Sequence, residues 1–152
     1  MAFWIGVAIV AVALLSGAVV LARRMQAKRL LDRYSVDADG LFALLNPVAT
    51  VLVVDVRQPL DLLAHSEIIP GAMRIAPKEA LENSFTLPKD QDAVIYCTCP
   101  GDKTSRSILH KVLELKFTRL RILRGGLEGW KAKGYPVERY DKSFRLDTEG
   151  VK

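Results

Sequence analysis

The sequence predicts an α/β domain, a small parallel sheet with helices on both faces, preceded by one transmembrane helix. Two β-branched apolar runs, Thr50–Val56 and Ala93–Cys97, lack polar alternation. Such runs are typical of strands buried on both faces of a parallel sheet. The amphipathic stretch Ser105–Leu115 follows the second run. Strands that alternate with helices indicate parallel pairing.

The N-terminal segment carries no charged residue from Ala2 to Ala22. About twenty residues at the helical rise cover roughly the thickness of a bilayer's hydrocarbon core. Phe3 and Trp4 stand at one end, where aromatic rings suit the interface. A cleavable signal peptide would need a basic start and a shorter apolar core. We therefore expect residues 2–22 to form an uncleaved membrane anchor.

Basic residues follow this apolar run directly, at Arg23, Arg24, Lys28 and Arg29. Because Lys and Arg next to a span stay cytoplasmic, we expect the soluble domain to face the cytoplasm, with a bacterial inner membrane as the location. Residues 23–34 form a juxtamembrane basic linker. This cluster supplies much of the net charge of +5, and no basic stripe with aromatics occurs elsewhere, which argues against nucleic-acid binding.

Residues 35–140 contain the remaining expected elements, and residues 141–152 form a charged tail. Ser35–Asp39 is typical of a helix N-cap region, and the short helix it opens ends at Asn46-Pro47. Pro-Gly and Gly-Gly pairs predict turns, and Gly134 closes the last helix. The other expected elements are helices at Leu60–His65, Lys78–Asn83 and Leu127–Lys133, with short strands at Met73–Ala76 and Leu120–Leu123.

The candidate site is the loop that follows the second buried strand, where Cys97 and Cys99 stand two residues apart. Backbone amides of such a loop, together with the N-terminus of the next helix, stabilise a thiolate or an anionic persulfide. Two buried core thiols are the alternative, and the local pattern leaves both open. A structural disulfide is disfavoured because the ring would be tight. The candidate anion-binding residues of the loop are Pro100, Gly101, Asp102, Lys103, Thr104, Ser105 and Arg106.

Several motifs resemble those of rhodanese-like domains. Val53–Arg57 is similar to their Asp-Val-Arg strand, and Ile69–Ala72 to their Ile-Pro-Gly-Ala turn. Val94–Cys97 looks like the strand that ends at the active cysteine. Leu123–Trp130 and Gly134–Val137 match the closing Gly-Gly…Trp…Gly-Tyr-Pro-Val pattern. The chain is thus identified as a single-domain, membrane-anchored member of the rhodanese-like family, over roughly residues 35–139.

The resemblance implies sulfur transfer. In such domains a cysteine thiolate takes sulfur from a donor such as thiosulfate and passes it, as a persulfide, to a nucleophilic acceptor. We expect Asp55 to fix the loop by hydrogen bonds and Arg57 to pair with a nearby acid. No cofactor is implied, and two cysteines lack the remaining ligands of a closed zinc centre.

The chain departs from the family pattern at two places. Glu67-Ile68 replaces the usual Gly-His, so His65 is only a shifted candidate for that histidine. The strand alignment selects Cys97 as the nucleophile, whereas counting back from the Gly-Gly pair selects Cys99. We favour Cys99 because the backbone amides of the loop can surround the sulfur only if it lies near the N-terminus of the following helix. Pro100 lacks an amide donor and Asp102 could repel an anion, so we expect poor turnover of thiosulfate.

Related phosphatases carry an arginine six residues after the cysteine, but here Lys103 or Ser105 stands there, which argues against a phosphatase. The leading hypothesis is a membrane-tethered sulfurtransferase or persulfide carrier, with an unidentified sulfur donor and thiol acceptor. The alternatives are a Cys97/Cys99 dithiol redox protein and a non-catalytic docking module for a membrane-protein partner.

Overall fold

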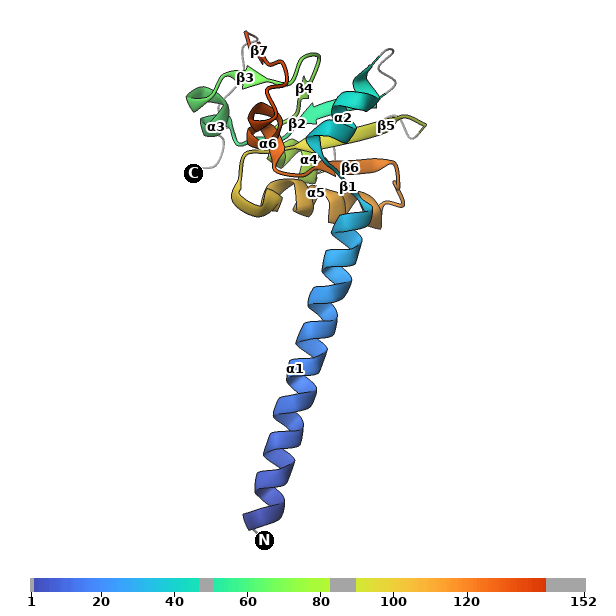
Figure 1. Cartoon of the computed structure of the whole chain (residues 1–152), viewed down its shortest axis with the longest axis vertical. Coiled ribbons are helices and arrows are strands. Elements are labelled where there is room, and N and C mark those ends of the chain that lie inside the picture. Colours follow the sequence, from blue (N-terminus) through green and yellow to red (C-terminus); the bar gives the residue numbers. More distant parts are fainter. Residues whose placement is uncertain (1, 47–50, 83–89, 142–152) are drawn as a thin grey trace. The chain divides into compact units, whose positions relative to one another are not determined.

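The structure, a computed structural model, describes residues 2–46, 51–82 and 90–141 (Figure 1). The chain divides into two compact units, Met1–Tyr34 and Ser35–Lys152. The first unit consists of one helix, α1 (Ala2–Arg33), which runs through both the apolar segment and the basic linker. Counting only the part of the chain that the structure describes, no helix combines the length and hydropathy of a membrane-crossing segment. The span predicted over residues 2–22 is not found by this criterion.

The second unit is built on a five-stranded sheet of order β1-β6-β5-β2-β4, in which every pair is parallel, as predicted. In the register of β2 against β5, Val53 lies opposite Val94 and Asp55 opposite Tyr96. The carboxyl ends of the two central strands therefore lie side by side, which is where parallel sheets bind ligands. The strands are β1 (Ser35–Val36), β2 (Val51–Asp55), β4 (Met73–Arg74), β5 (Asp92–Tyr96) and β6 (Leu120–Leu123).

The helices of this unit agree closely with those predicted. Asp37 caps α2 by accepting a hydrogen bond from the Gly40 amide at 2.8 Å. Ser35-Val36, expected within the cap region, instead pairs with β6 as an edge strand. The helix after the cysteines begins at Lys103, two residues before the predicted start. The helices are α2 (Ala38–Leu45), α3 (Pro59–Ala64), α4 (Pro77–Glu82), η1 (Pro100–Asp102), α5 (Lys103–Glu114) and α6 (Gly126–Ala132).

Helices cover both faces of the sheet, as predicted. Because successive side chains of a strand point to opposite faces, β5 presents Val94 and Tyr96 to one side and Ala93 and Ile95 to the other. The first pair packs in a core cluster with residues of α2 and α6. On the opposite side α5 lies along β6 and beside α4, as Figure 1 shows. The sheet is thus buried on both faces, which explains its apolar strands.

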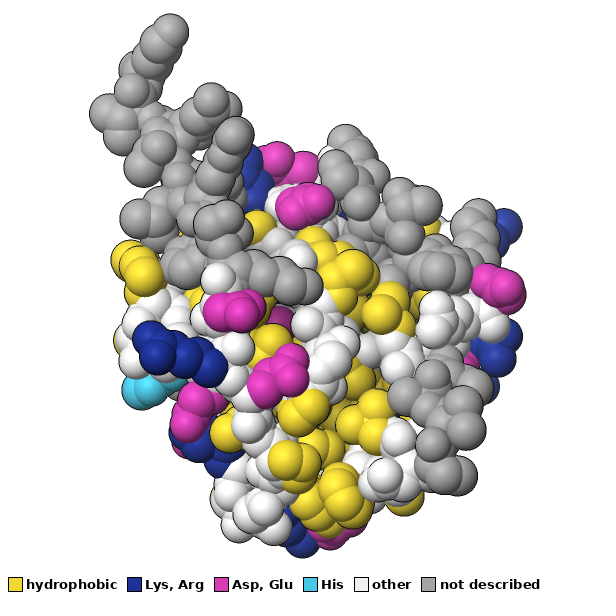
Figure 2. Space-filling view, turned by 90° about the horizontal axis from the view of Figure 1, so that it is seen from above, with side chains coloured by type: hydrophobic (Ala, Val, Ile, Leu, Met, Phe, Trp, Pro, Cys, Tyr) yellow, Lys and Arg dark blue, Asp and Glu magenta, His cyan; other side chains and the backbone are white. Residues whose placement is uncertain are grey.

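A two-stranded antiparallel ribbon, β3 (Glu67–Ile68) with β7 (Glu138–Arg139), was not predicted, because each strand contributes only two residues. Two side chains of α2, Phe42 and Leu44, are partly exposed. Figure 2 shows apolar side chains gathered on the face seen from above, with Asp and Glu among them. Most of the predicted charged tail, residues 142–152, lies outside the described residues.

Candidate active site

The two cysteines lie directly after β5, at the carboxyl end of the sheet. Cys97 is only 1% exposed, whereas Cys99 is half-buried. Their sulfur atoms are 2.9 Å apart. Of the two, Cys97 alone fits the alternative of a buried core thiol, and Cys99 is the one that an external molecule can reach.

The loop after Cys99 turns back on itself, so that the next helix begins beside the Cys99 sulfur. Gly101 and Asp102 adopt left-handed backbone angles, with φ of 65° and 54°. This bend lets the Asp102 amide donate to the Cys99 carbonyl at 3.1 Å. Two residues later the Thr104 amide donates to Cys99 Sγ at 3.2 Å, and the Cys99 thiol lies 3.4 Å from Thr104 Oγ1. A sulfur anion at Cys99 therefore meets a helix N-terminus and a backbone donor.

The surroundings shift the pKa values of the two thiols in opposite directions. Burial, with the hydrogen bond to Cys99, raises the pKa of Cys97 to about 11, although the hydroxyl and amide of Ser105 act against it. Burial also opposes ionisation of Cys99. There, however, hydrogen bonds from Cys97 and from the Thr104 hydroxyl and amide prevail and lower the Cys99 pKa. Near neutral pH the pair therefore holds a thiolate more readily at Cys99 than at Cys97.

The charged residues of the loop take two different places. Asp102 turns toward α6, where its Oδ2 accepts a hydrogen bond from the Gly125 amide at 3.3 Å. Burial raises the Asp102 pKa, while the Gly125 amide and Arg106 act in the opposite direction. Lys103 is exposed and Arg106 partly so, and both line a shallow groove of about 430 Å³ on the outer side of the loop. The remaining lining residues of this groove are Gly101, Ser107 and His110.

Ser105, a predicted anion-binding residue, lies on the inner side of the same helix turn. Its side chain is fully buried, and its Oγ makes no hydrogen bond of ordinary length. Its hydroxyl and amide interact with the Cys97 thiol and act to lower the pKa of that thiol. Ser105 therefore faces the buried cysteine instead of an external ligand.

The Gly-Gly pair, Gly125 and Gly126, sets how closely α6 approaches the backbone of Cys97. Gly126 has φ of 53°, and a Cβ at this position would lie 1.8 Å from the Cys97 carbonyl oxygen. The adjacent Leu127 amide points at the same oxygen, at 3.4 Å. Only glycine permits this approach, so the pair brings α6 against the backbone of Cys97. The sequence motif thus has a direct steric role beside the cysteines.

The predicted supporting residues, Asp55 and Arg57, form a fully buried ion pair, and Asp55 lies opposite Tyr96, the residue before Cys97. The Arg57 guanidinium donates to both carboxylate oxygens of Asp55 and to the carbonyls of His65 and Glu67, over 2.6–3.0 Å. Their role is to tie β2 to the segment before the Ile-Pro-Gly-Ala turn. His65 contributes only its backbone carbonyl here, and its side chain is exposed.

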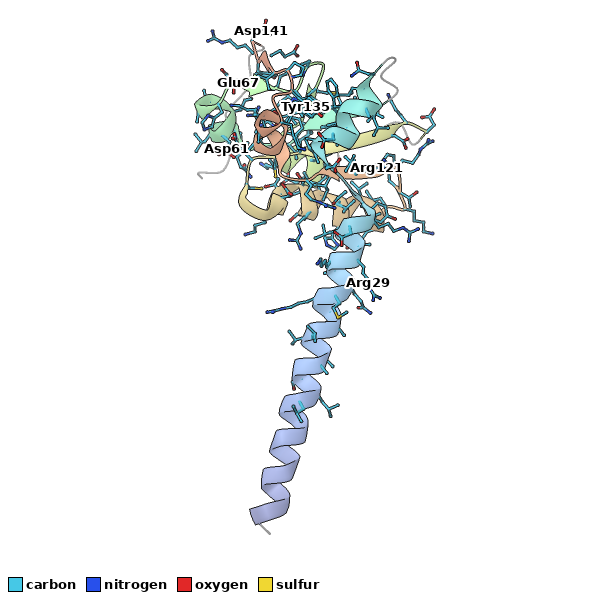
Figure 3. All side chains as sticks on the ribbon, viewed as in Figure 1. Arg29, Asp61, Glu67, Arg121, Tyr135 and Asp141 are labelled. Carbon is cyan, nitrogen blue, oxygen red and sulfur yellow. The ribbon has the colours of Figure 1, made fainter. Side chains whose placement is uncertain are left out.

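Sequence reasoning missed the hydrogen bonds of two side chains near the site, first those of Tyr96 and then that of Thr98. The Tyr96 hydroxyl donates to Asp55 Oδ2 at 3.1 Å and accepts from the Ile69 amide at 3.2 Å. Asp61 of α3, labelled in Figure 3, accepts a hydrogen bond from the Thr98 hydroxyl at 3.2 Å. The phenol at the end of an apolar strand was a usable signal for the first contact. In the described ranges no three His, Cys, Asp or Glu side chains gather to hold a metal ion.

A parallel sheet with a cysteine loop at its carboxyl end is the arrangement expected of a rhodanese-like domain. Comparison with known families agrees with this expectation. The family described as "Rhodanese-like domain" matches residues 37–133, more than half of the chain. The chain therefore belongs to the rhodanese-like family. The matched range contains both cysteines, the buried ion pair and the Gly-Gly pair.

Individual relatives agree with this assignment. A curated protein of Allochromatium vinosum named "Sulfurtransferase" is 28% identical over 102 residues, which are 67% of this chain and 92% of that protein. A crystal structure of a Bacillus halodurans protein is 27% identical, with a TM-score of 0.59, and covers 78% of this chain and 85% of its own. A full-length Lactobacillus plantarum protein, 24% identical with a TM-score of 0.65, shares the fold over 78% of this chain and 98% of its own. The family match and the curated relative support a function of the sulfurtransferase type, and the two crystal structures show the shared fold.

Proposed function

We propose that this protein carries sulfane sulfur as a persulfide on Cys99 and delivers it to a thiol or another nucleophile. In the first half-reaction the Cys99 thiolate attacks the outer sulfur of a donor, and the remainder of the donor leaves. In the second half-reaction an acceptor attacks the outer sulfur of the persulfide, and the Cys99 thiolate is regenerated.

The observation that carries this proposal is the hydrogen bond from the Thr104 amide to Cys99 Sγ at 3.2 Å. This donor lies in the first turn of α5, a helix of 12 residues, whose positive end also favours an anion. A thiolate and a terminal persulfide anion need the same stabilisation. The lowered pKa of Cys99 and its partial exposure suit a nucleophile that meets external donors.

The natural donor is part of the proposal, and Asp102 bears on it. Its carboxylate lies in the loop that an anionic donor must approach, although the Gly125 amide holds it toward α6. Burial raises its pKa, but a residual negative charge still disfavours thiosulfate, a dianion. We expect thiosulfate to load Cys99 more slowly than an uncharged or organic persulfide donor of equal reactivity.

The test is to treat the full-length protein with thiosulfate, and separately with glutathione persulfide, and to measure its intact mass. The proposal predicts a gain of one sulfur atom that cyanide removes, in the wild type and in Cys97→Ser but not in Cys99→Ser. Loading of Cys99→Ser but not of Cys97→Ser would move the nucleophile to Cys97. Absence of any sulfur gain in the wild type and in both variants, with both donors, would leave a docking module as the function.

We further propose that α1 anchors the protein in a bacterial inner membrane, with the rhodanese-like domain in the cytoplasm. This proposal rests on the sequence: residues 2–22 lack charge, and Arg23, Arg24, Lys28 and Arg29 follow them. Wild-type protein should stay in the membrane pellet after alkaline washing. Leu14→Arg with Leu15→Arg should weaken insertion, since each charge near a span centre costs about 2.5–3.5 kcal/mol. Equal release of the wild type and this variant into the wash would refute the anchor.

A further inference from the structure

The buried thiol of Cys97 has no place in the transfer cycle described above, yet its sulfur lies in contact with that of Cys99. The two sulfur atoms are 2.9 Å apart, whereas a disulfide bond needs about 2.05 Å. With 1% exposure, Cys97 cannot be reached by a donor or an acceptor from solution. Any chemistry of this thiol must therefore pass through Cys99.

We infer that Cys97 discharges the Cys99 persulfide: its sulfur attacks the inner sulfur, a Cys97–Cys99 disulfide forms, and hydrogen sulfide leaves. The inference rests on the proposed function, since it needs the persulfide on Cys99. It adds a second outcome to the cycle, in which sulfane sulfur is reduced and released instead of being handed on.

The step is balanced in atoms and electrons. A lone pair of Cys97 Sγ forms the new S–S bond, and the pair of the old S–S bond leaves with the outer sulfur. The proton of the Cys97 thiol ends on the leaving sulfide. Cys97 is oxidised from thiol to disulfide, and the outer sulfur is reduced to sulfide. Two molecules of a small thiol then reduce the disulfide and become a disulfide themselves.

The burial of Cys97 and the partial exposure of Cys99 suit this displacement. Displacement at sulfur requires the attacking atom and the leaving atom on opposite sides of the sulfur attacked. Cys97 lies on the buried side of Cys99, and the half-exposed side of Cys99 is open to solvent. An outer sulfur on the open side thus leaves toward solvent while Cys97 approaches from within.

The surroundings of Cys97 fit a thiol that must ionise only during attack. Ser105 is fully buried, and its Oγ has no hydrogen bond of ordinary length. Its hydroxyl and amide act to stabilise the Cys97 anion, against the burial that keeps this thiol protonated at rest. Cys97 therefore brings its own proton to the step. A disulfide between cysteines only two positions apart closes a strained ring, so small thiols reduce it readily.

The experiment uses the full-length protein, loaded with glutathione persulfide, freed of small molecules and kept without any acceptor thiol. Intact mass under non-reducing conditions and released sulfide are followed over time. The wild-type species with one extra sulfur should convert to a species lacking two hydrogens relative to the dithiol, with one equivalent of sulfide released. Dithiothreitol should then restore the dithiol mass.

Two variants separate this inference from the proposed function. Cys97→Ala and Cys97→Ser should still gain one sulfur at Cys99, and the persulfide should survive at least about tenfold longer, because the intramolecular attacker is gone. Loading followed by equal persulfide lifetimes in the wild type and both variants would overturn the inference but keep the proposed function. Wild-type sulfur that moves to Cys97 without sulfide release would also overturn it. No loading in any form would overturn the proposed function itself.

Discussion

Replacement of Gly126 by alanine tests whether the approach of α6 to Cys97 is essential to the site. The added Cβ would lie 1.8 Å from the Cys97 carbonyl oxygen and 3.0 Å from its carbonyl carbon. Both are backbone atoms, so no side chain can rotate away. Because interiors are close-packed, either α6 or the end of β5 must shift by roughly 1 Å or more.

The cost has two parts that can be separated. An alanine at φ of 53° loses about 1–2 kcal/mol from backbone strain alone. The shift also breaks the contact of the Leu127 amide with Cys97, which adds about 1 kcal/mol, and disturbs packing around it. We expect Gly126→Ala to lower the free energy of unfolding by about 3 kcal/mol or more. A displacement of this size at the cysteines should slow sulfur loading on the order of 10²-fold.

Gly134→Ala is the matched control. Gly134 has φ of 73°, also left-handed, but an added Cβ there meets nothing within 4 Å. This variant should lose only the strain of about 1–2 kcal/mol and should load sulfur at the wild-type rate. Urea unfolding gives the free energies, and the initial rate of sulfur gain by mass gives the loading. Equal losses of stability and equal loading rates in the two variants would refute the steric role of Gly126.

Three further substitutions test other parts of the site, and Arg119→Ala serves as an exposed control for the first. Arg57→Ala should lower the free energy of unfolding by about 3–5 kcal/mol because it leaves a buried carboxylate unpaired. In Arg119→Ala, which breaks an ion pair whose arginine is 50% exposed, the loss should be at most about 1 kcal/mol. Since thiolate accumulates as pH rises and the Cys99 pKa is lowered, the wild-type loading rate should reach its half-maximum below the pH expected of an ordinary thiol. Thr104→Val removes one stabilising hydroxyl and should move that midpoint upward; an unchanged midpoint would contradict this role. Tyr96→Phe should cost about 1–3 kcal/mol in urea unfolding, because a buried amide loses its acceptor.

Sequence reasoning predicted the sheet and most of its helices because their signals are local. The β-branched runs at β2 and β5 and the amphipathic spacing of α5 follow from burial periodicity, which the chain displays directly. It failed where pairing is set by distant partners. Ser35-Val36 carries no strand pattern of its own and becomes a strand only because β6 lies next to it. The ribbon of β3 and β7 is also missed, because two residues per strand show no pattern and only their pairing across the fold makes them strands.

For the site, the sequence by itself determined the chemistry available: two cysteines, a following Pro-Gly loop, a helix N-terminus and a Gly-Gly pair. Family motifs placed these at the end of a parallel strand. Only the tertiary structure decided how the cysteines differ. The bend of the loop at Asp102 brings the Thr104 amide within hydrogen-bond distance of Cys99 Sγ. Cys97, in contrast, is buried between the sheet and Ser105. Solvent exposure and hydrogen-bond donors depend on segments that are remote in sequence, so no local pattern assigns them.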